Sequence, residues 1–374
     1  MSNAKVKVGL IGCGNISRQY CTGMGLFDIL EIVACADIEI DRAEALAAEF
    51  NIPRVYSPEQ LLADPEIQIV VNLTIPAAHA AVNMAALQAG KHAYCEKPFA
   101  VHRPEGQKVL ALAEEKGLLV GCAPETFMGG GLQTCRKLID DGWIGQPIAA
   151  SAFMMGHGPE GWHPNPDFFY QVGGGPMFDM GPYYLTALVH LLGPIKKVAG
   201  FARSSFPERI ITNANDRYGE RIPVEVPTHV SGSVEFASGA IGSLIISFDV
   251  WGSHLPRIEI YGSEGTLAVP DPNTFGGPIF IKKASPDVRN RNDWEEIPLT
   301  YNANVKRGIG VADMAYALTY NRPHRVSGTM AYHVLDLMHA FYDASEQETT
   351  ITVSSTCDRP ALFPVGLLPG TLDQ

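Results

Sequence analysis

A glycine-rich turn near the start of the chain has the residue types that a dinucleotide needs. The stretch from Gly12 to Ser17 reads Gly-Cys-Gly-Asn-Ile-Ser, follows an apolar run and opens a helical pattern. Gly12 permits a tight turn, and Gly14 lets the backbone approach a pyrophosphate. Asn15 and Ile16 would open the helix, whose free N–H groups and positive dipole end face the phosphates. Ser17 takes the place of the third glycine of the G-x-G-x-x-G pattern and is still small enough for helix and strand to pack.

An acidic residue after the second predicted strand bears on the choice of cofactor. Asp37 can accept hydrogen bonds from the adenosine ribose hydroxyls, and its charge repels a 2′-phosphate. The next three residues, Ile38-Glu39-Ile40, include no base. We therefore predict NAD rather than NADP. Two alternatives stay open: Asp37 as an ordinary turn residue, and Arg42 bending back toward a 2′-phosphate.

Alternating strands and helices must position these residues. Strands are predicted at Lys5–Ile11, Ile32–Ala36, Val55, Ile67–Leu73, His92–Cys95 and Leu118–Gly121, with helices at Ile16–Met24, Asp41–Phe50, Ala77–Ala89 and Pro104–Lys116. Near-continuous Val/Ile/Leu strands separated by helices are typical of a parallel sheet covered on both faces. We predict an α/β protein whose residues 1–122 form a doubly wound Rossmann domain.

The remaining residues, 123–374, follow a different pattern. Strands are predicted at Ile148–Met155, Val226–Phe236, Ala240–Asp249, Arg257–Tyr261 and Thr266–Val269, and helices at Met180–Leu192, Gly308–Leu318 and Thr329–Ala344. Successive strands with helices grouped apart predict an α+β domain with a large, mostly antiparallel open sheet. The Gly/Pro-rich and aromatic stretch Gly156–Gly175 is expected to be a structured loop, and such loops often build sites.

Bulk composition excludes several classes of partner. A chain of 374 residues is long enough for two domains. The net charge of −12 argues against general affinity for nucleic acid or anionic membranes. No apolar run approaches the roughly 18–20 residues that span a bilayer, and the N-terminal layout is not that of a signal peptide. The seven cysteines form no C-x-x-C pair. We expect a cytoplasmic protein with buried free thiols, binding neither nucleic acid nor a membrane.

Three further stretches follow the glycine turn along the chain. Thr74-Ile75-Pro76 with His79 follows the fourth strand, Glu96-Lys97-Pro98 ends the fifth, and Gly173 to Tyr183 reads GGGPMFDMGPY. Together with the glycine turn, they make the chain resemble the Gfo/Idh/MocA family, named for glucose–fructose oxidoreductase, inositol dehydrogenase and a rhizopine-catabolism protein. The resemblance spans most of the chain. It implies an NAD(P)-dependent dehydrogenase acting on CH–OH groups.

The resemblance assigns roles to residues of the first domain. Thr74, Pro76, His79 and Glu96 belong to the stretches that hold the cofactor, and a position just after the last Rossmann strand, Glu125 in this chain, contacts it. Lys97 matches the family lysine beside the nicotinamide and the reacting hydroxyl. An ammonium there can donate to the substrate oxygen and stabilise alkoxide character. The alternative for Lys97 is an ordinary surface lysine on a loop.

Asp179 and Tyr183 match the end of the family pattern in the second domain. Asp179 is implied to bind substrate or orient Lys97, although an aspartate at a helix start can also be a cap. Many relatives have histidine four residues later, where this chain has Tyr183. The pattern D-x-G-x-Y resembles the branch that includes glucose–fructose oxidoreductase, some xylose dehydrogenases and dihydrodiol dehydrogenase. Tyr183 would then be the acid/base, unless Tyr184 is or unless it is a packed core residue.

The loop before the triple glycine contributes candidate substrate contacts. In relatives it lines the nicotinamide and sugar cleft, often with a tryptophan followed by a basic residue, and Trp162-His163 fits that pattern loosely. His157 is nearby, but two histidines without clustered carboxylates predict no metal site. A late pair, His333 and Asp336, is as consistent with core as with a site.

These expectations combine into one functional hypothesis with two rivals. The chain would transfer a hydride between NAD(H) and a sugar, cyclic polyol or sugar derivative held between the domains, as a homodimer or homotetramer. One rival is a redox-neutral enzyme that acts on glycosides through a 3-keto intermediate. The other is a non-catalytic regulator that binds NAD and a sugar, against which Lys97, Asp179 and Tyr183 count.

Overall fold

The chain forms two compact units that are not contiguous in sequence. The computed structural model describes residues 5–285 and 293–373. One unit, the Rossmann unit, comprises Met1–Gln133, Thr300–Tyr332 and Pro360–Gln374; the other, the sheet unit, comprises Thr134–Leu299 and His333–Arg359. Sequence analysis predicts a single boundary after residue 122, whereas the chain returns twice to the Rossmann unit. The return is explained by packing, because Met314 lies where a side chain at Gly121 would otherwise project.

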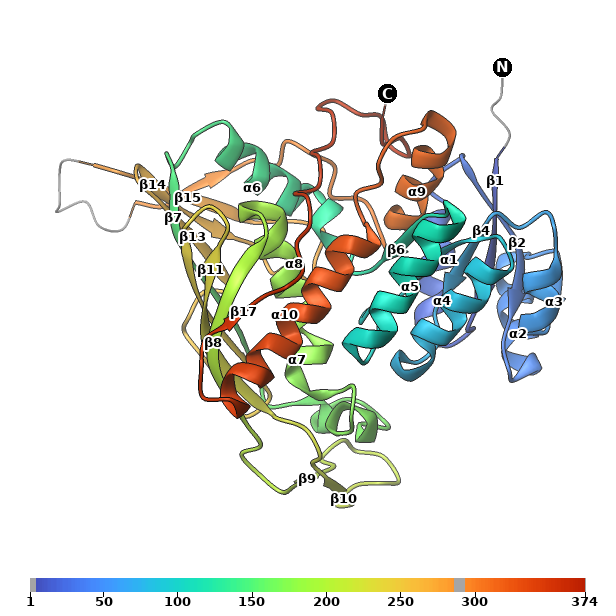
Figure 1. The fold of residues 1–374 in the computed structure, drawn as a ribbon, viewed down its shortest axis with the longest axis horizontal. Coiled ribbons are helices and arrows are strands. Elements are labelled where there is room, and N and C mark those ends of the chain that lie inside the picture. Colours follow the sequence, from blue (N-terminus) through green and yellow to red (C-terminus); the bar gives the residue numbers. More distant parts are fainter. Residues whose placement is uncertain (1–4, 286–292, 374) are drawn as a thin grey trace. The chain divides into compact units, whose positions relative to one another are not determined.

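The Rossmann unit contains a six-stranded parallel sheet in the order β3-β2-β1-β4-β5-β6. The strands are β1 (Val6–Ile11), β2 (Leu30–Ala36), β3 (Arg54–Tyr56), β4 (Ile69–Asn72), β5 (His92–Cys95) and β6 (Val120–Cys122). Its helices are α1 (Asn15–Met24), α2 (Ile40–Phe50), α3 (Pro58–Ala63), α4 (His79–Gln88), α5 (Arg103–Lys116) and α9 (Ile309–Tyr320). This confirms the predicted doubly wound fold (Figure 1).

Burial and local capping explain these elements. The central strand β1 has only one residue that is not fully buried, as expected for a strand covered on both faces. Helix α3 begins with a capping box in which Ser57 and Gln60 bond reciprocally, with Pro58 as the first helical residue. Helix α5 ends at Gly117, whose φ of 63° lies in the left-handed region that glycine adopts freely. Local sequence thus sets where these helices begin and end.

The sheet unit contains a nine-stranded sheet in the order β16-β15-β14-β13-β7-β12-β11-β8-β17. The strands are β7 (Pro147–Met155), β8 (Ile195–Arg203), β11 (His229–Phe236), β12 (Ile241–Ser247), β13 (Ile258–Gly262), β14 (Gly265–Val269), β15 (Ile279–Lys283), β16 (Glu295–Ile297) and β17 (Ile351–Thr352). All neighbouring pairs are antiparallel except β7 with β12. The prediction of a large, mostly antiparallel sheet is confirmed.

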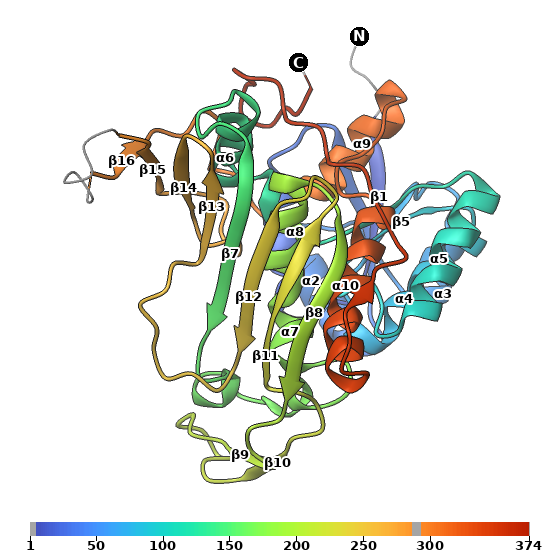
Figure 2. The ribbon, with the colours of Figure 1, turned by 60° about the vertical axis from the view of Figure 1, so that its left-hand side comes forward.

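Helices cover one face of this sheet, and a separate hairpin lies beyond its end (Figure 2). Helices α7 (Gly175–Asp179) and α8 (Gly181–Leu192) pack on β7, β11 and β12. Helices α6 (Gly130–Asp140) and α10 (Gly328–Glu346) each contribute residues to both units. The short strands β9 (Glu208–Ile210) and β10 (Arg221–Pro223) pair as a two-stranded sheet.

Two expectations from composition concern the whole chain. All seven cysteines are free and buried. Among the helices that the structure describes, none combines the length and apolarity needed to span a bilayer.

Candidate functional site

The carboxyl edge of the Rossmann sheet brings the predicted cofactor residues together. Gly12 follows β1, Asp37 follows β2, Thr74 follows β4, and Glu96-Lys97 follows β5. The strands β2, β1, β4 and β5 are consecutive neighbours in a parallel sheet, so their carboxyl ends lie along one edge. Open α/β sheets bind their ligands at this edge.

Gly12 is required by the backbone that surrounds it. Its φ is +100°, and a Cβ atom built there would lie 2.7 Å from the carbonyl carbon and oxygen of Leu73. Its amide donates to the carbonyl of Ala36 at 2.9 Å. The turn after β1 therefore packs closely against the ends of β2 and β4, and only glycine fits at position 12.

The start of α1, which follows Gly12 and Cys13, has open space at Gly14. Gly14 is the N-cap of α1, and a Cβ there would meet nothing within 4 Å. No side chain caps the helix, and its first turn contains no acidic residue. Asn15 is exposed and Ile16 is half-buried. An uncapped helix start with room above it and no acidic residue in its first turn fits a pyrophosphate.

Asp37 supports the glycine turn directly. One carboxylate oxygen accepts the Cys13 amide at 2.7 Å, and the other accepts the Glu39 amide at 2.9 Å. Asp37 is thus a turn residue, but each oxygen keeps a second lone pair, which leaves capacity for a ribose hydroxyl. Ile38 and Ile75, 87% and 69% exposed, follow β2 and β4 and add apolar surface at the same edge. Sequence analysis names these isoleucines only as neighbours of Asp37 and Thr74, because their exposure cannot be read from the sequence.

Lys97 lies at this edge on a well-held peptide. Its backbone N–H donates to the side chain of Glu96 at 2.9 Å, and its own side chain is half-buried. The preceding residue Glu96 and the following residue Pro98 are buried. The lysine side chain is the accessible part of an otherwise buried Glu-Lys-Pro stretch.

Beneath this stretch lies a buried cluster of two carboxylates and two tyrosines. Tyr20 donates to Glu96 at 2.8 Å, and Tyr94 donates to Glu125. Glu125 also accepts the Gly308 amide at 2.7 Å. Its side chain is fully buried, and burial raises its pKa. The structure therefore places Glu125 inside the unit, bonded to protein groups, whereas sequence analysis predicts it in contact with cofactor.

The stretch after β4 divides between surface and interior. Thr74 and Pro76 are half-buried at the edge, and Pro76 begins a short 3-10 turn, Pro76–Ala78. His79 is fully buried, with its ring between the carbonyls of Thr74 and Pro98. Thr74 and Pro76 thus offer surface at the edge, and His79 lies behind it.

In the sheet unit, Trp162 and His163 lie in an aromatic group on the long loop after β7. The Trp162 ring is 65% exposed and meets His163 and Phe169 edge-on, with ring centroids 5.5 and 6.1 Å apart. His163 also meets Phe168 edge-on at 5.3 Å. The loop therefore presents an exposed tryptophan backed by packed rings.

Side chains from a distant segment hold the backbone of this loop. Asn213 donates to the carbonyl of Trp162 at 3.0 Å, and Asn215 donates to the carbonyl of Pro164 at 3.1 Å. Arg217 binds Asp167 through both terminal nitrogens, at 2.6 and 2.9 Å. Sequence analysis missed these residues, because polar residues between two short strands carry no distinguishing pattern.

A buried ionic group anchors the start of the same loop. Arg209 bonds to Glu160 at 2.9 Å and to Asp249 at 2.7 Å, and also to the carbonyl of His157. All three charged side chains are at most 7% exposed. Tyr170 donates to the second oxygen of Glu160. Because Arg209 joins β9 to the end of β12 and to the loop, it fixes where the loop leaves the sheet.

Asp179 and Tyr183 lie across a break between two helices. Asp179 is the last residue of α7, and Tyr183, 4% exposed, lies in the first turn of α8. Met180 is the N-cap of α8, which has no side-chain capping bond, so Asp179 does not cap it. Met180 has φ −107° and ψ −26°, near the helical region, so Asp179 and Tyr183 stay about one turn apart. Tyr184, beside it, is fully buried.

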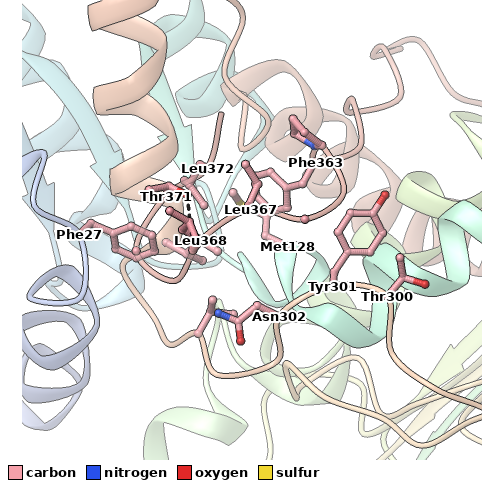
Figure 3. A pocket seen from close by; sticks show the side chains of 15 residues that line it. Phe27, Met128, Thr300, Tyr301, Asn302, Phe363, Leu367, Leu368, Thr371 and Leu372 are labelled. Carbon is pink, nitrogen blue, oxygen red and sulfur yellow. Dashed lines mark hydrogen bonds between the residues drawn. The ribbon is translucent and has the colours of Figure 1, made fainter. Parts of the chain in front are cut away.

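A cavity of about 90 Å³ in the Rossmann unit is separate from all of these residues. The C-terminal segment covers it, and its walls include Phe27, Met128, Phe363 and Leu368 (Figure 3). None of the predicted site residues lines it. Its lining combines these apolar side chains with polar ones, among them Thr300, Asn302 and Thr371.

Comparison with known proteins identifies the two halves of the chain. Residues 6–123 match the oxidoreductase family with an NAD-binding Rossmann fold, and residues 132–268 match the GFO/IDH/MocA C-terminal domain. The two matches follow one another and together span most of the chain.

Individual relatives agree with both matches. 1,5-Anhydro-D-fructose reductase of Ensifer adhaerens is 28% identical, over 78% of this chain and 82% of its own length. Trans-1,2-dihydrobenzene-1,2-diol dehydrogenase of Mus musculus is 29% identical, over 70% of this chain and 73% of its own. The structure of levoglucosan dehydrogenase in complex with NADH has a TM-score of 0.80 at 21% identity, covering 94% of this chain and all of that one. The predicted resemblance is confirmed: the chain belongs to the Gfo/Idh/MocA family of oxidoreductases.

Proposed function

We propose that the protein transfers a hydride between NAD(H) and a CH–OH group of a sugar, cyclic polyol or sugar derivative. The observation that carries this proposal is the gathering of Gly12, Asp37, Thr74 and Lys97 along one edge of the Rossmann sheet. The relatives named above, which include an anhydro-sugar reductase and a diol dehydrogenase, support the substrate class.

The residues at this edge fit NAD. Gly14, Asn15 and Ile16 would hold the pyrophosphate at the uncapped start of α1. The carboxylate of Asp37 would accept from the adenosine ribose and disfavour a 2′-phosphate, so NAD is preferred to NADP. When bound, the nicotinamide supplies the hydride acceptor.

Three residues would carry the remaining chemistry. In the oxidation direction the substrate alcohol loses a hydride from carbon to the cofactor and a proton from oxygen to the protein. Lys97 would donate a hydrogen bond to that oxygen and stabilise its developing negative charge. Tyr183, as the phenolate, would accept the proton and become the neutral phenol, and Asp179 would orient the reacting groups. Trp162 and His163 would contact the sugar face.

The test is a spectrophotometric screen of sugars, polyols and glycosides with NAD⁺ and NADP⁺. It compares the wild type with Lys97→Ala and with Lys108→Ala, which removes an exposed lysine from α5. NADH formation that falls about 10²–10⁴-fold in Lys97→Ala, and is unchanged in Lys108→Ala, is the expected result. A flat trace from wild type that still binds NADH would overturn the proposal in favour of a redox-neutral enzyme or a regulator.

We further propose that the protein works in the cytoplasm as a homodimer or homotetramer. The face of the sheet opposite α7 and α8 supports assembly. On strands β8 and β12 it carries Phe201, 77% exposed, and Ile241, 59% exposed. Apolar side chains at this exposure are typical of surfaces that associate.

A further inference from the structure

We propose that His79 is a positioning residue that fixes the Lys97-Pro98 peptide against the turn at Thr74. The inference rests on the proposed function of Lys97. It concerns a residue that sequence analysis places in contact with the cofactor and that the structure buries completely. The two stretches that it joins follow β4 and β5, which are neighbours in the sheet.

The imidazole ring lies between two backbone carbonyls. Nδ1 is 2.7 Å from the carbonyl oxygen of Pro98, and Nε2 is 3.0 Å from that of Thr74. The ring is rigid and its two nitrogens point in different directions, so the separation of the two carbonyls is set by its dimensions. Pro98 follows Lys97 directly, so the ring constrains the backbone from which the lysine side chain extends.

A neighbouring asparagine holds the other side of this link. Asn72 donates from Nδ2 to the backbone carbonyl of His79 at 3.0 Å and to Asn83 at 3.0 Å. Its Oδ1 accepts from the amide and the hydroxyl of Thr74, at 3.2 and 2.6 Å. The backbone of His79 and the turn at Thr74 are therefore tied to the end of β4. The imidazole ring of His79 then connects these groups to Pro98.

Hydrogen-bond chemistry identifies which nitrogen matters more. A carbonyl oxygen only accepts, and a neutral imidazole has a single N–H, so it can donate to only one of the two carbonyls. Burial lowers the pKa of His79, whereas the two carbonyl contacts, to Pro98 and Thr74, act in the opposite direction. The shorter contact, 2.7 Å against 3.0 Å, favours Nδ1 as the donor, and it leads to Pro98. Nε2 is also within hydrogen-bond distance of a carbonyl oxygen, that of Thr74, and donates to it when the ring carries a second proton.

This geometry matters because hydride transfer tolerates little misplacement. Catalytic groups need to be held within about 0.5 Å of their productive positions. Lys97 reaches its substrate oxygen over a flexible side chain, so its backbone must be well fixed. Asp37 and the glycine turn hold the opposite half of the cofactor and do not depend on His79.

Two amide substitutions separate the two ring contacts. His79→Asn places an amide nitrogen close to the position of Nδ1, whereas His79→Gln places one close to Nε2. We expect His79→Asn to retain kcat within about threefold, and His79→Gln and His79→Leu to lose at least tenfold. The dissociation constant for NADH should stay within about threefold in all three. Hydrogen exchange should become faster in peptides covering 73–76 and 96–100 of His79→Leu.

His333→Leu is the matched control. His333 is also fully buried, in the sheet unit, and its ring accepts the Ile195 amide at 3.1 Å and contacts Ser355 at 2.9 Å. The substitution His333→Leu should lower stability without changing kcat or the rate of hydrogen exchange in residues 96–100. The proposal is overturned if His79→Asn and His79→Gln are equally impaired, or if His79→Leu leaves kcat within twofold and exchange at 96–100 unchanged. If the wild type shows no turnover, the proposed function fails. The hydrogen-exchange measurement alone then decides whether His79 positions the Lys97-Pro98 peptide. If His79→Leu does not fold, the Asn–Gln pair decides.

Discussion

The glycine turn of the Rossmann unit and the Trp162 loop of the sheet unit are held in different ways. The glycine turn is shaped by its own backbone and by strand ends around it, with Asp37 as its nearest side-chain support. The Trp162 loop is held by side chains from far along the chain, including Arg209 and Asn213. A motif can encode the first arrangement within a few dozen residues. The second depends on ionic and amide bonds between segments that have no common pattern.

The largest expected effect comes from removing the anchor of the Trp162 loop. Arg209→Met leaves Glu160 and Asp249 buried without their cation, which costs about 3–5 kcal/mol of unfolding free energy. Because Trp162 and His163 are proposed to contact the sugar, KM for the substrate should rise while the dissociation constant for NADH stays constant. Urea denaturation and NADH fluorescence titration measure the two quantities.

Arg221→Met is the control for that experiment. Arg221 pairs with Glu208 on the same hairpin, but its side chain is 65% exposed, so its loss should cost no more than about 1 kcal/mol. Equal losses in the two variants, or weakened NADH binding in Arg209→Met, would remove the distinction between the two regions.

Substitutions at two glycines of the turn should separate an effect on stability from an effect on NADH binding. Both effects are expected to be smaller than that of Arg209→Met. Gly12→Ala brings a Cβ within 2.7 Å of Leu73 at a φ of +100°, so we expect about 3 kcal/mol or more of destabilisation. Gly14→Ala meets no protein atom, so stability should change by less than about 1 kcal/mol while NADH binding weakens at least tenfold. Thermal unfolding with and without NADH would test both. A stable Gly12→Ala, or a Gly14→Ala that binds NADH normally, would contradict this account of the turn.

The smallest effect concerns Glu125, where the Rossmann unit also relies on distant side chains. Burial raises the pKa of Glu125 above its ordinary value of 4.5, so the folded protein favours the protonated acid. Its stabilising contribution is therefore full below the unfolded pKa and is lost as pH rises through the folded pKa. The unfolding free energy of wild type relative to Glu125→Gln should fall from pH 4.5 upward, by about 1.4 kcal/mol per unit of pKa difference. Glu115→Gln, an exposed change on α5, should show no such trend, and a flat difference for Glu125→Gln would refute the assignment.

The fold could be predicted where one face of an element is patterned by burial. The Rossmann strands and the central strands of the large sheet were found because their apolar runs are bounded by turns. Strand β8 was not, since Lys196, Lys197 and Gly200 interrupt its apolar positions. Helix α6 was missed because it begins with two glycines, and the return of residues 300–332 to the first unit has no local signal at all.

The candidate site shows the same division. Gly12, Gly14 and Lys97 could be placed at the sheet edge because strand ends and motifs coincide there. The interior positions of His79 and Glu125 could not be predicted, because each depends on groups brought in by tertiary contacts, such as the Gly308 amide. Sequence indicates which residues are near a site, whereas tertiary contacts decide which of their side chains are bonded to other protein groups.

The C-terminal segment has a consequence for how the protein is made. Arg325 bonds to the carbonyl of Ala361 at 3.0 Å, and Arg322 pairs with Asp373. The Rossmann unit therefore contains strands that are translated before the sheet unit and a segment that is translated more than 200 residues after β6. During vectorial synthesis the sheet unit has been translated in full before the N-terminal unit is complete. Removal of residues 360–373 would therefore affect the unit whose strands are translated before the sheet unit.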